Sequence, residues 1–384
     1  MTDGTWLDEW LKDAVDADEA AHLTAQLVAV RSYPGEEGDV QRAIAAWLTQ
    51  NGLSVCVQPT IGDRPNISAT LENGDGRTLL LNGHVDTVLR ADGWSSDPWT
   101  PRRVGDRLYG LGACDMKSGI AAALLTTRAL ARRPDLWRGR LIFSAVVDEE
   151  AHSIGARALL GNLAQVDACV VTESAFAHPA LGSVGKVLIR AEVSGKAAHA
   201  SWPDGGVNAA VEAARFAVQL RSATLGDHPR LRASQTVLSL HSGSDQYVMT
   251  VPEQATILIN RHTVPGETDA SILTQMDGIA TELDSPATFT FQIDPPYYPP
   301  WETPVDHPFV SCFSAVYALE TGVAPDFGYT GFGDANLFAG ERGIPTIHFG
   351  PHGGNFHQAD EWVDVPSIST TVRILLRLAI GTLT

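Results

Sequence analysis

The order of hydrophobic and polar residues along the chain changes twice. Residues 18–181 alternate apolar runs, which predict buried strands, with amphipathic stretches, which predict helices. Residues 182–294 contain half-exposed alternating strands and Ala-rich helices in a β-α-β-β-α-β order, which is typical of a ferredoxin-like fold. The first pattern returns after a proline-rich segment that we interpret as a stiff linker. The sequence therefore predicts one α/β domain, formed by residues 1–181 and 295–384, with an inserted α+β domain at residues 182–294.

One apolar run ends abruptly in three acids. Residues 141–147 are rich in β-branched and aromatic side chains, which predicts a strand that is buried on both faces. Asp148, Glu149 and Glu150 follow directly. Three buried carboxylates without partners would be costly, so they either lie in water or are held by a cation. Ligands of open α/β sheets bind beyond the carboxyl ends of the strands, where these acids fall. A solvated acidic turn would explain this segment taken alone.

Acidic and histidine residues also end the neighbouring predicted elements. His84 ends one strand, Glu173 ends another, and Asp115 lies among three glycines at the start of a helix. Right-handed crossovers between parallel strands would bring these ends to one edge of a sheet. Asp86 and His84 point to the same side of an extended chain, and a carboxylate close to an imidazole can orient a metal-bound histidine. Taken singly, these residues also fit a surface pair and a helix N-cap.

Size and charge restrict the classes of partner. The 384 residues are too many for one ordinary core, which agrees with two domains. The net charge of -18 would repel nucleic acid and anionic lipid. No apolar run approaches the roughly 20 residues that cross a bilayer, and the acidic N-terminal segment is unlike a secretory or transit peptide. The four scattered cysteines indicate a cytoplasmic protein with reduced, mostly buried thiols.

Five short motifs, taken in order, are specific although each is weak alone. They are Gly83-His-Val-Asp86, Tyr109-Gly-x-Gly-Ala-x-Asp-Met-Lys117, Asp148-Glu-Glu150, Thr172-Glu173 and His357-x-x-Asp-Glu361. With them the chain resembles, nearly from end to end, the dinuclear zinc deacylase and exopeptidase family, which includes acetylornithine deacetylase, succinyl-diaminopimelate desuccinylase, aminoacylase and carboxypeptidase G. The resemblance implies a zinc-exopeptidase-like catalytic domain with a mainly parallel sheet flanked by helices. It also implies that the inserted domain is a lid that serves for dimerisation.

The resemblance further implies a centre of two divalent metal ions. His84 and Glu173 would bind one ion, Glu150 and His357 would bind the other, and Asp115 would bridge them. Imidazole and carboxylate donors favour Zn²⁺, and Co²⁺ or Mn²⁺ could substitute. Members of the family often have a cis peptide bond after the bridging acid, which here would be the bond after Asp115.

Other residues receive roles from the same resemblance. Glu149 would be the general base, and Asp86 would be the partner of His84. His199, in the inserted domain, would donate a hydrogen bond to the oxyanion, often from the partner subunit, and Arg261 would hold a substrate carboxylate. The loop that lines the substrate pocket would contain Gly331, Gly333, Asp334 and Asn336.

The chain departs from the family pattern in two places. Many relatives have Asp two residues before the lid arginine, where this chain has Ile259. His352 lies in a loop that is usually glycine-rich, and we interpret it as a solvent-facing residue or one that supports a ligand. We interpret His348 as a strand histidine whose hydrogen bonds are satisfied.

The implied reaction is hydrolysis of the amide bond of an N-acyl amino acid by a metal-activated water, with Glu149 as general base. A di- or exopeptidase that releases a C-terminal amino acid would use the same centre. A non-catalytic metal-dependent binding protein is a third alternative, but a pure binder has no use for an unligated base such as Glu149. The expected partners are a small N-acyl amino acid or short peptide and a second copy of the chain, bound through the inserted domain as a homodimer. Nucleic acid and membrane are not expected.

Overall fold

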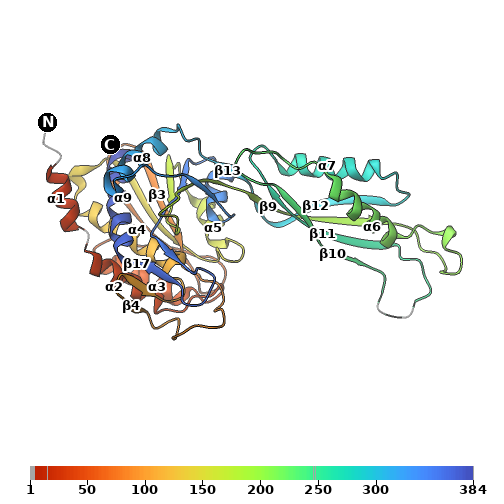
Figure 1. Ribbon diagram of the computed structural model, residues 1–384, viewed down its shortest axis with the longest axis horizontal. Helices are drawn as coiled ribbons and strands as arrows, with labels where there is room; N and C mark the ends of the chain where they lie inside the picture. Colours follow the sequence, from red (N-terminus) through yellow and green to blue (C-terminus); the bar gives the residue numbers. More distant parts are fainter. Residues whose placement is uncertain (1–4, 15, 245, 247, 384) are drawn as a thin grey trace. The chain divides into compact units, whose positions relative to one another are not determined.

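The computed structural model describes residues 5–14, 16–244, 246 and 248–383, and the chain forms two compact units (Figure 1). The first unit contains the chain up to Gly182, Thr303–Tyr329 and the chain from Gly333 onward. The second unit contains Ser183–Glu302 and Thr330–Phe332. The second unit is therefore mainly one long insertion in the first.

A sheet with a parallel centre forms the middle of the first unit. Its strands are β1 Cys56–Gln58, β2 Asn66–Asn73, β3 Thr78–His84, β6 Gly139–Val146, β7 Ala168–Val171, β8 Ala180–Ser183 and β15 Thr346–His348. They lie in the order β1-β2-β6-β3-β7-β15-β8. The pairs β6–β3, β3–β7 and β7–β15 are parallel, whereas β1, β2 and β8 join antiparallel. The prediction of a mainly parallel central sheet is confirmed.

Helices cover this sheet because its central strands are apolar on both faces. Every residue of β3 is buried, and all but one residue of β6 are buried. The helices of the first unit are α1 Thr5–Ala14, α2 Ala17–Val28, α3 Gly38–Gln50, α4 Ser118–Ala131, α5 Ile154–Asn162, α8 Pro308–Thr321 and α9 Val365–Leu383. Helices α4 and α9 pack on β3 and β6, and α4 also packs on α2. Because α4 is buried on nearly every side, the segment that leads into it starts from a rigid support.

A small antiparallel sheet joins two distant segments of the first unit. Its strands are β4 Arg102–Val104, β5 Arg107–Tyr109, β16 Gly353–Gly354 and β17 Trp362–Asp364, in the order β16-β17-β5-β4. Trp362 of β17 pairs with Tyr109 of β5. This pairing places the segment that follows residue 109 beside the segment that precedes residue 362.

The second unit is an antiparallel sheet with helices packed on it, and its elements follow the predicted β-α-β-β-α-β order (Figure 1). They are β9 Gly185–Ser194, α6 Ala209–Gln219, β10 Ser234–Ser242, β11 Gln254–Thr263, α7 Asp269–Glu282 and β12 Thr288–Tyr298. The strands lie in the order β10-β11-β9-β12. Every second residue of β9 and β11 is buried, and these residues form one core with apolar residues of α6 and α7. The predicted ferredoxin-like domain is confirmed as a fold.

The predicted proline-rich linker at residues 295–300 is wrong for most of its length. Strand β12 continues to Tyr298 and includes Pro295 and Pro296. A proline lacks the N–H that a ladder uses, and it is tolerated here because β12 is the edge strand of its sheet. The pairing of β12 with β9 becomes irregular between Asp294 and Tyr298, where the prolines lie.

The remaining elements are short. They are η1 Ala113–Lys117, η2 Pro134–Leu136, η3 Pro203–Gly205, η4 Leu220–Ser222, η5 Asn336–Glu341, β13 Trp301–Glu302 and β14 Gly328–Thr330. All four cysteines are free; Cys114 and Cys169 are buried, Cys312 is partly buried and Cys56 is exposed. Within the part of the chain that the structure describes, no helix combines the length and apolar character needed to cross a membrane.

Candidate metal centre

Five acidic and histidine side chains converge where the parallel strands of the first unit end. His84 is the last residue of β3, while the glutamates follow β6 and β7 closely in the chain. The aspartate lies in η1, directly before α4, and the second histidine lies between β16 and β17. We call these residues the acid–histidine cluster: His84, Asp115, Glu150, Glu173 and His357. These are the five residues for which the sequence predicts metal binding.

Asp115 lies between the two histidines of the cluster. Its Oδ1 is 3.2 Å from His84 Nε2, and its Oδ2 is 3.1 Å from His357 Nε2. Glu173 Oε1 is 3.1 Å from His84 Nε2, and Glu150 Oε1 is 3.3 Å from His357 Nε2. Donor atoms of His84, Asp115 and Glu150 all lie within 4.8 Å of one another. The cluster therefore consists of two pairs of donors that share one carboxylate.

The backbone around Asp115 has an unusual local structure. Gly112 has a φ of 79°, in the left-handed region that glycine tolerates best. The peptide bond between Asp115 and Met116 is cis, as the resemblance implied. Lys117 is buried, and its Nζ donates hydrogen bonds to two carbonyl oxygens at the C-terminal end of α2. Asp115 is not the N-cap of α4, because its two oxygens face the histidines instead.

The carboxylate of Asp86 contacts both the backbone of the acidic turn and the ring of His84. Its buried carboxylate accepts hydrogen bonds from the N–H of Glu149 at 3.1 Å and from the N–H of Glu150 at 2.9 Å. His84 Nδ1 lies 3.0 Å from the main-chain oxygen of Asp86 and 3.5 Å from its Oδ1. The side chain of Asp86 thus fixes where the two glutamates start, and its main-chain oxygen and carboxylate together orient the imidazole.

The cluster is short of positive charge. Burial raises the pKa of Glu173 to about 7. Hydrogen bonds to Asp115 and Glu150 raise the pKa of His357 to about 10. Burial opposes a charge on His84, yet the surrounding carboxylates raise its pKa well above the usual value. The protonated forms of Glu173, His84 and His357 are therefore favoured, which means that the cluster favours additional positive charge.

Glu149 lies against the loop for which the sequence predicts substrate contacts. A β-carbon placed on Gly333 would lie 2.3 Å from Glu149 Oε1, so the glycine leaves room for this carboxylate. Burial raises the pKa of Glu149 well above its usual value. Asp334 and Asn336 are themselves buried, and Asn336 Oδ1 accepts a hydrogen bond from the Gly333 N–H. Gly333 thus lies beside the carboxylate of the proposed base.

The two site residues predicted in the second unit differ in exposure. His199 is exposed, and its Nδ1 accepts a hydrogen bond from the N–H of Ser201 at 3.1 Å. Arg261 is buried; it forms an ion pair with Glu267 and donates a hydrogen bond to Gln275 Oε1 at 2.5 Å. The roles of both residues remain predictions.

His348 was expected to be a strand histidine whose hydrogen bonds are satisfied. It lies on β15 beside β7, and its Nδ1 has no hydrogen-bond partner among the described residues, so its interpretation as a satisfied strand histidine is wrong. Burial lowers its pKa to about 4, although Asp115 acts in the opposite direction. Its place in an apolar strand gave no signal of this, because the unpaired nitrogen is a property of the packed sheet. His352 is exposed, with its ring edge against Trp362.

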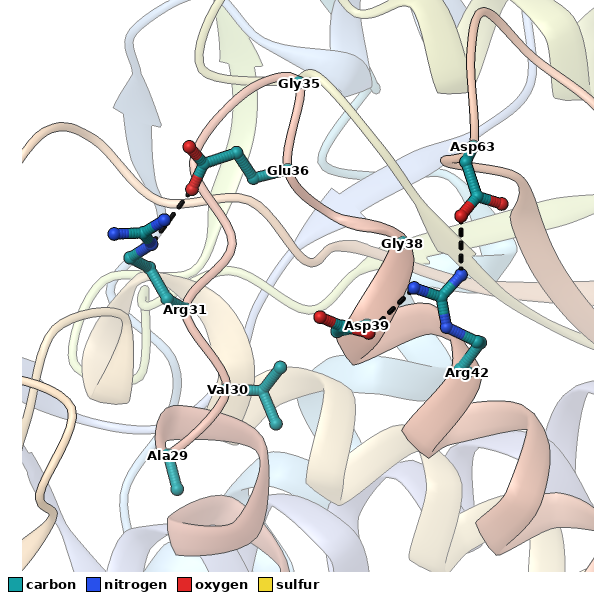
Figure 2. Close-up of a pocket in the computed structure, with 9 residues that line it drawn as sticks. All are labelled: Ala29, Val30, Arg31, Gly35, Glu36, Gly38, Asp39, Arg42 and Asp63. Atoms are coloured by element: carbon teal, nitrogen blue, oxygen red, sulfur yellow. Dashed lines mark hydrogen bonds and ion pairs between the residues drawn. The ribbon is translucent and has the colours of Figure 1, made fainter.

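A separate surface pocket of about 700 Å³ lies between the end of α2 and the start of α3 (Figure 2). In it Arg31 pairs with Glu36, and Arg42 pairs with both Asp39 and Asp63. The two guanidinium groups that could attract an anion are therefore already paired with carboxylates. No residue of the acid–histidine cluster lines this pocket.

Comparison with known proteins agrees with this geometry. The acetylornithine deacetylase of Photorhabdus laumondii is 27% identical over 389 residues, covering 93% of this chain and 95% of that protein. The succinyl-diaminopimelate desuccinylase of Paracoccus denitrificans is 26% identical over 94% of this chain and 97% of its own length. The structure of aminopeptidase PepT from Bacillus cereus shares the fold, with a TM-score of 0.76 at 21% identity over 97% of this chain and all of that one.

The match to a family extends well beyond the motifs themselves. Residues 80–380 match the family model described as peptidase family M20/M25/M40, which is more than half of the chain. This span includes every residue of the acid–histidine cluster. The resemblance inferred from the five motifs is confirmed: the chain is a hydrolase that belongs to peptidase family M20/M25/M40.

Proposed function

We propose that the protein hydrolyses the amide bond of an N-acyl amino acid at a centre of two divalent cations. The observation that carries the proposal is the convergence of the acid–histidine cluster, with Asp115 shared between two histidines and Glu149 beside it. The relatives that cover nearly the whole chain bear the names of a deacetylase and a desuccinylase, which supports a deacylase over a peptidase.

The residues of the cluster fit a pair of cations. All their donor atoms are imidazole nitrogens or carboxylate oxygens, and the buried Glu150 Oε1 faces His357 Nε2 at 3.3 Å. His84 and Glu173 would hold one cation, Glu150 and His357 the other, with Asp115 between them. This donor set suits Zn²⁺, and Co²⁺ or Mn²⁺ would also be accepted.

The chain's own residues account for the proton transfers. When bound, the two cations would lower the pKa of a water from about 15.7 toward about 7 and polarise the scissile carbonyl. Glu149 takes a proton from the attacking water at a carboxylate oxygen and delivers it to the leaving amine. Burial raises the pKa of Glu149, which suits a group that must hold a proton between two transfers. Asp86 fixes the position of this base through the Glu149 N–H.

Residues of the second unit complete the proposal. His199 donates a hydrogen bond to the oxyanion, as the family resemblance implies. The resemblance also implies that Arg261 binds a carboxylate of the substrate, for which its guanidinium would have to exchange its pairing with Glu267. The second unit also joins two copies of the chain. Exposed apolar side chains on α6 and on the edge strand β10 support this role; they are Val211, Val218, Leu238 and Leu240. Light scattering that gives the mass of a single chain for the active protein would contradict the dimer.

The test is an activity screen combined with metal analysis. The purified protein is treated with a chelator, reloaded with Zn²⁺, Co²⁺ or Mn²⁺, and assayed against N-acetyl amino acids and dipeptides. We expect activity on N-acetyl amino acids that disappears on chelation and returns with metal. Turnover of dipeptides alone would assign a peptidase instead, and activity that survives complete metal removal would refute the metal centre. Glu36→Gln, at an exposed ion pair of the Figure 2 pocket, serves as a control that should leave activity unchanged.

A further inference from the structure

Glu361 is a buried acid that the proposed reaction does not use. Its side chain is 1% exposed, although it lies in the same short segment as His357. Its main-chain oxygen accepts a hydrogen bond from the Gly110 N–H at 3.0 Å, next to the pairing of β17 with β5. A carboxylate is seldom buried this fully without strong partners. Its partners therefore indicate its function.

The partners of the Glu361 carboxylate are three backbone N–H groups of one turn. Oε2 accepts from Gly112 at 2.9 Å, and Oε1 accepts from Cys114 at 2.8 Å and from Asp115 at 3.0 Å. The N–H of Ala113, between them, donates to the Gly110 oxygen instead. A turn in which several N–H groups point to one place forms a concave site for an anion. Gly112 makes this possible because its φ of 79° turns the chain, and a β-carbon there would lie 2.6 Å from the Thr87 side chain.

These bonds connect two parts of the acid–histidine cluster. Asp115 is the residue whose side chain faces both histidines, and its own N–H is one of the three donors. Glu361 lies four residues after His357, whose Nε2 is 3.1 Å from Asp115 Oδ2. The carboxylate of Glu361 thus ties the segment that carries one histidine to the turn that carries the shared aspartate.

We propose that Glu361 is a positioning residue, which sets Asp115 at the place where it can be shared by two cations. The inference rests on the proposed metal centre and adds to it a residue that touches neither cation nor substrate. Carboxylates that support a metal ligand in this way typically contribute 10- to 100-fold to metal affinity. Hydrogen bonds to a charged group are also the ones whose loss is felt most.

The test compares Glu361→Gln, Glu361→Ala and Glu320→Gln with the unaltered protein. Glutamine keeps the shape but has only one acceptor oxygen. If this oxygen accepts from the N–H groups of Cys114 and Asp115, the NH₂ group of the glutamine faces the Gly112 N–H, and that hydrogen bond is lost. Glu320 is the matched control, because its partly buried carboxylate pairs with Arg373 and Arg377 and takes no part in the cluster. Removing it perturbs the fold of the same unit without touching Asp115.

The measurements are calorimetric titration of the chelated proteins with Zn²⁺ and the visible spectrum of the Co²⁺ forms. We expect Glu361→Gln to weaken Zn²⁺ affinity about 10- to 100-fold and to alter the Co²⁺ bands, and Glu361→Ala to do so at least as strongly. Glu320→Gln should keep both at the unaltered level while lowering the melting temperature. If Glu361→Ala does not fold, Glu361→Gln decides the matter.

The outcomes separate this inference from the proposed function. Affinity and spectrum unchanged in both Glu361 variants would overturn the positioning role alone. The same loss of affinity in Glu320→Gln would show that general destabilisation is the cause, which also overturns it. An unaltered protein that binds no divalent cation would refute the metal centre and this inference together. Two bound cations without amide hydrolysis would refute the reaction and leave the role of Glu361 supported.

Discussion

Replacing Gly333 with alanine should lower kcat about 100-fold without unfolding the protein. A β-carbon at this position would lie 2.3 Å from Glu149 Oε1, whereas ordinary contact begins at 3.4 Å. The carboxylate must therefore retreat by about 1 Å, and a misplacement of this size at a reacting group can cost about 100-fold in rate. That factor corresponds to about 2.7 kcal/mol in the activation free energy. The fold should tolerate the change, because the displaced atom is the end of a flexible side chain and Gly333 has no positive φ.

The chain offers a matched control outside the site. A β-carbon at Gly161, in an exposed position near the end of α5, would meet nothing within 4 Å, so Gly161→Ala adds the same methyl group without displacing Glu149. The assay measures kcat, KM and melting temperature for both variants with the best substrate of the N-acetyl amino acid panel. We expect kcat to fall about 100-fold in Gly333→Ala only, with the melting temperature equal to or slightly above that of the unaltered protein. Equal kcat values in the two variants would refute the assignment of Glu149 as the base.

Three further predictions concern the same centre. Glu149→Gln should lower kcat about 10²- to 10⁴-fold with metal content unchanged; activity near that of the unaltered protein would exclude a base at this position. Asp86→Asn should lower kcat/KM roughly 10- to 150-fold, because one charge-assisted hydrogen bond of about 1.5–3 kcal/mol to the acidic turn is lost, and kinetics at several substrate concentrations would show it. The chelated protein should lose stability as pH rises from about 6.5 to about 10. Hydrogen bonds to Asp115 and Glu150 raise the pKa of His357 to about 10 in the folded protein. The folded form therefore keeps a proton on His357 that the unfolded form releases near pH 6.5, and this difference favours unfolding as the pH rises. Thermal melting across this range should show a shallower decline in His357→Gln, and parallel curves would contradict the linkage.

The sequence predicted where the acid–histidine cluster lies, but it did not predict the hydrogen bonds that hold the cluster in position. Apolar runs that end in polar residues indicated which side chains lie at the ends of strands, and the ends of parallel strands meet at one edge of a sheet. This is how the sequence predicted that His84, Glu150 and Glu173 lie close together. The elements themselves follow from periodicity: β3 and β6 lack polar interruptions, and they are buried as that pattern predicts.

The supporting hydrogen bonds could not be read in this way. Asp86 was expected to face His84, and its Oδ1 lies 3.5 Å from His84 Nδ1. The same carboxylate also accepts two N–H groups of the acidic turn, which lies more than sixty residues further along the chain and was not expected as its partner. The sequence identified Glu361 only as the last residue of the His357-x-x-Asp-Glu361 motif. Its three hydrogen-bond partners are backbone N–H groups, which every residue except proline has, so the sequence could not indicate them. Residue type reveals which side chains can bind a cation, whereas backbone donors become visible only when the chain is folded.

The proline-rich segment shows a different limit. Pro295 and Pro296 indicated a linker because proline usually interrupts strands. The position of β12 at the edge of its sheet removes that objection, since an edge strand has a ladder on one side only. Edge or centre is a property of the tertiary arrangement, so local composition gave the wrong answer here.

The members of the acid–histidine cluster are spread over residues 84–357, and an unfolded chain cannot gather them. Zn²⁺ at 100 times its dissociation constant would therefore favour the native first unit by about 2.7 kcal/mol, with little affinity for the denatured ensemble. In a cell starved of metal, a larger fraction of the chains would be open at any moment and exposed to proteases. Metal supply would then govern how long each polypeptide survives, in addition to whether it can act.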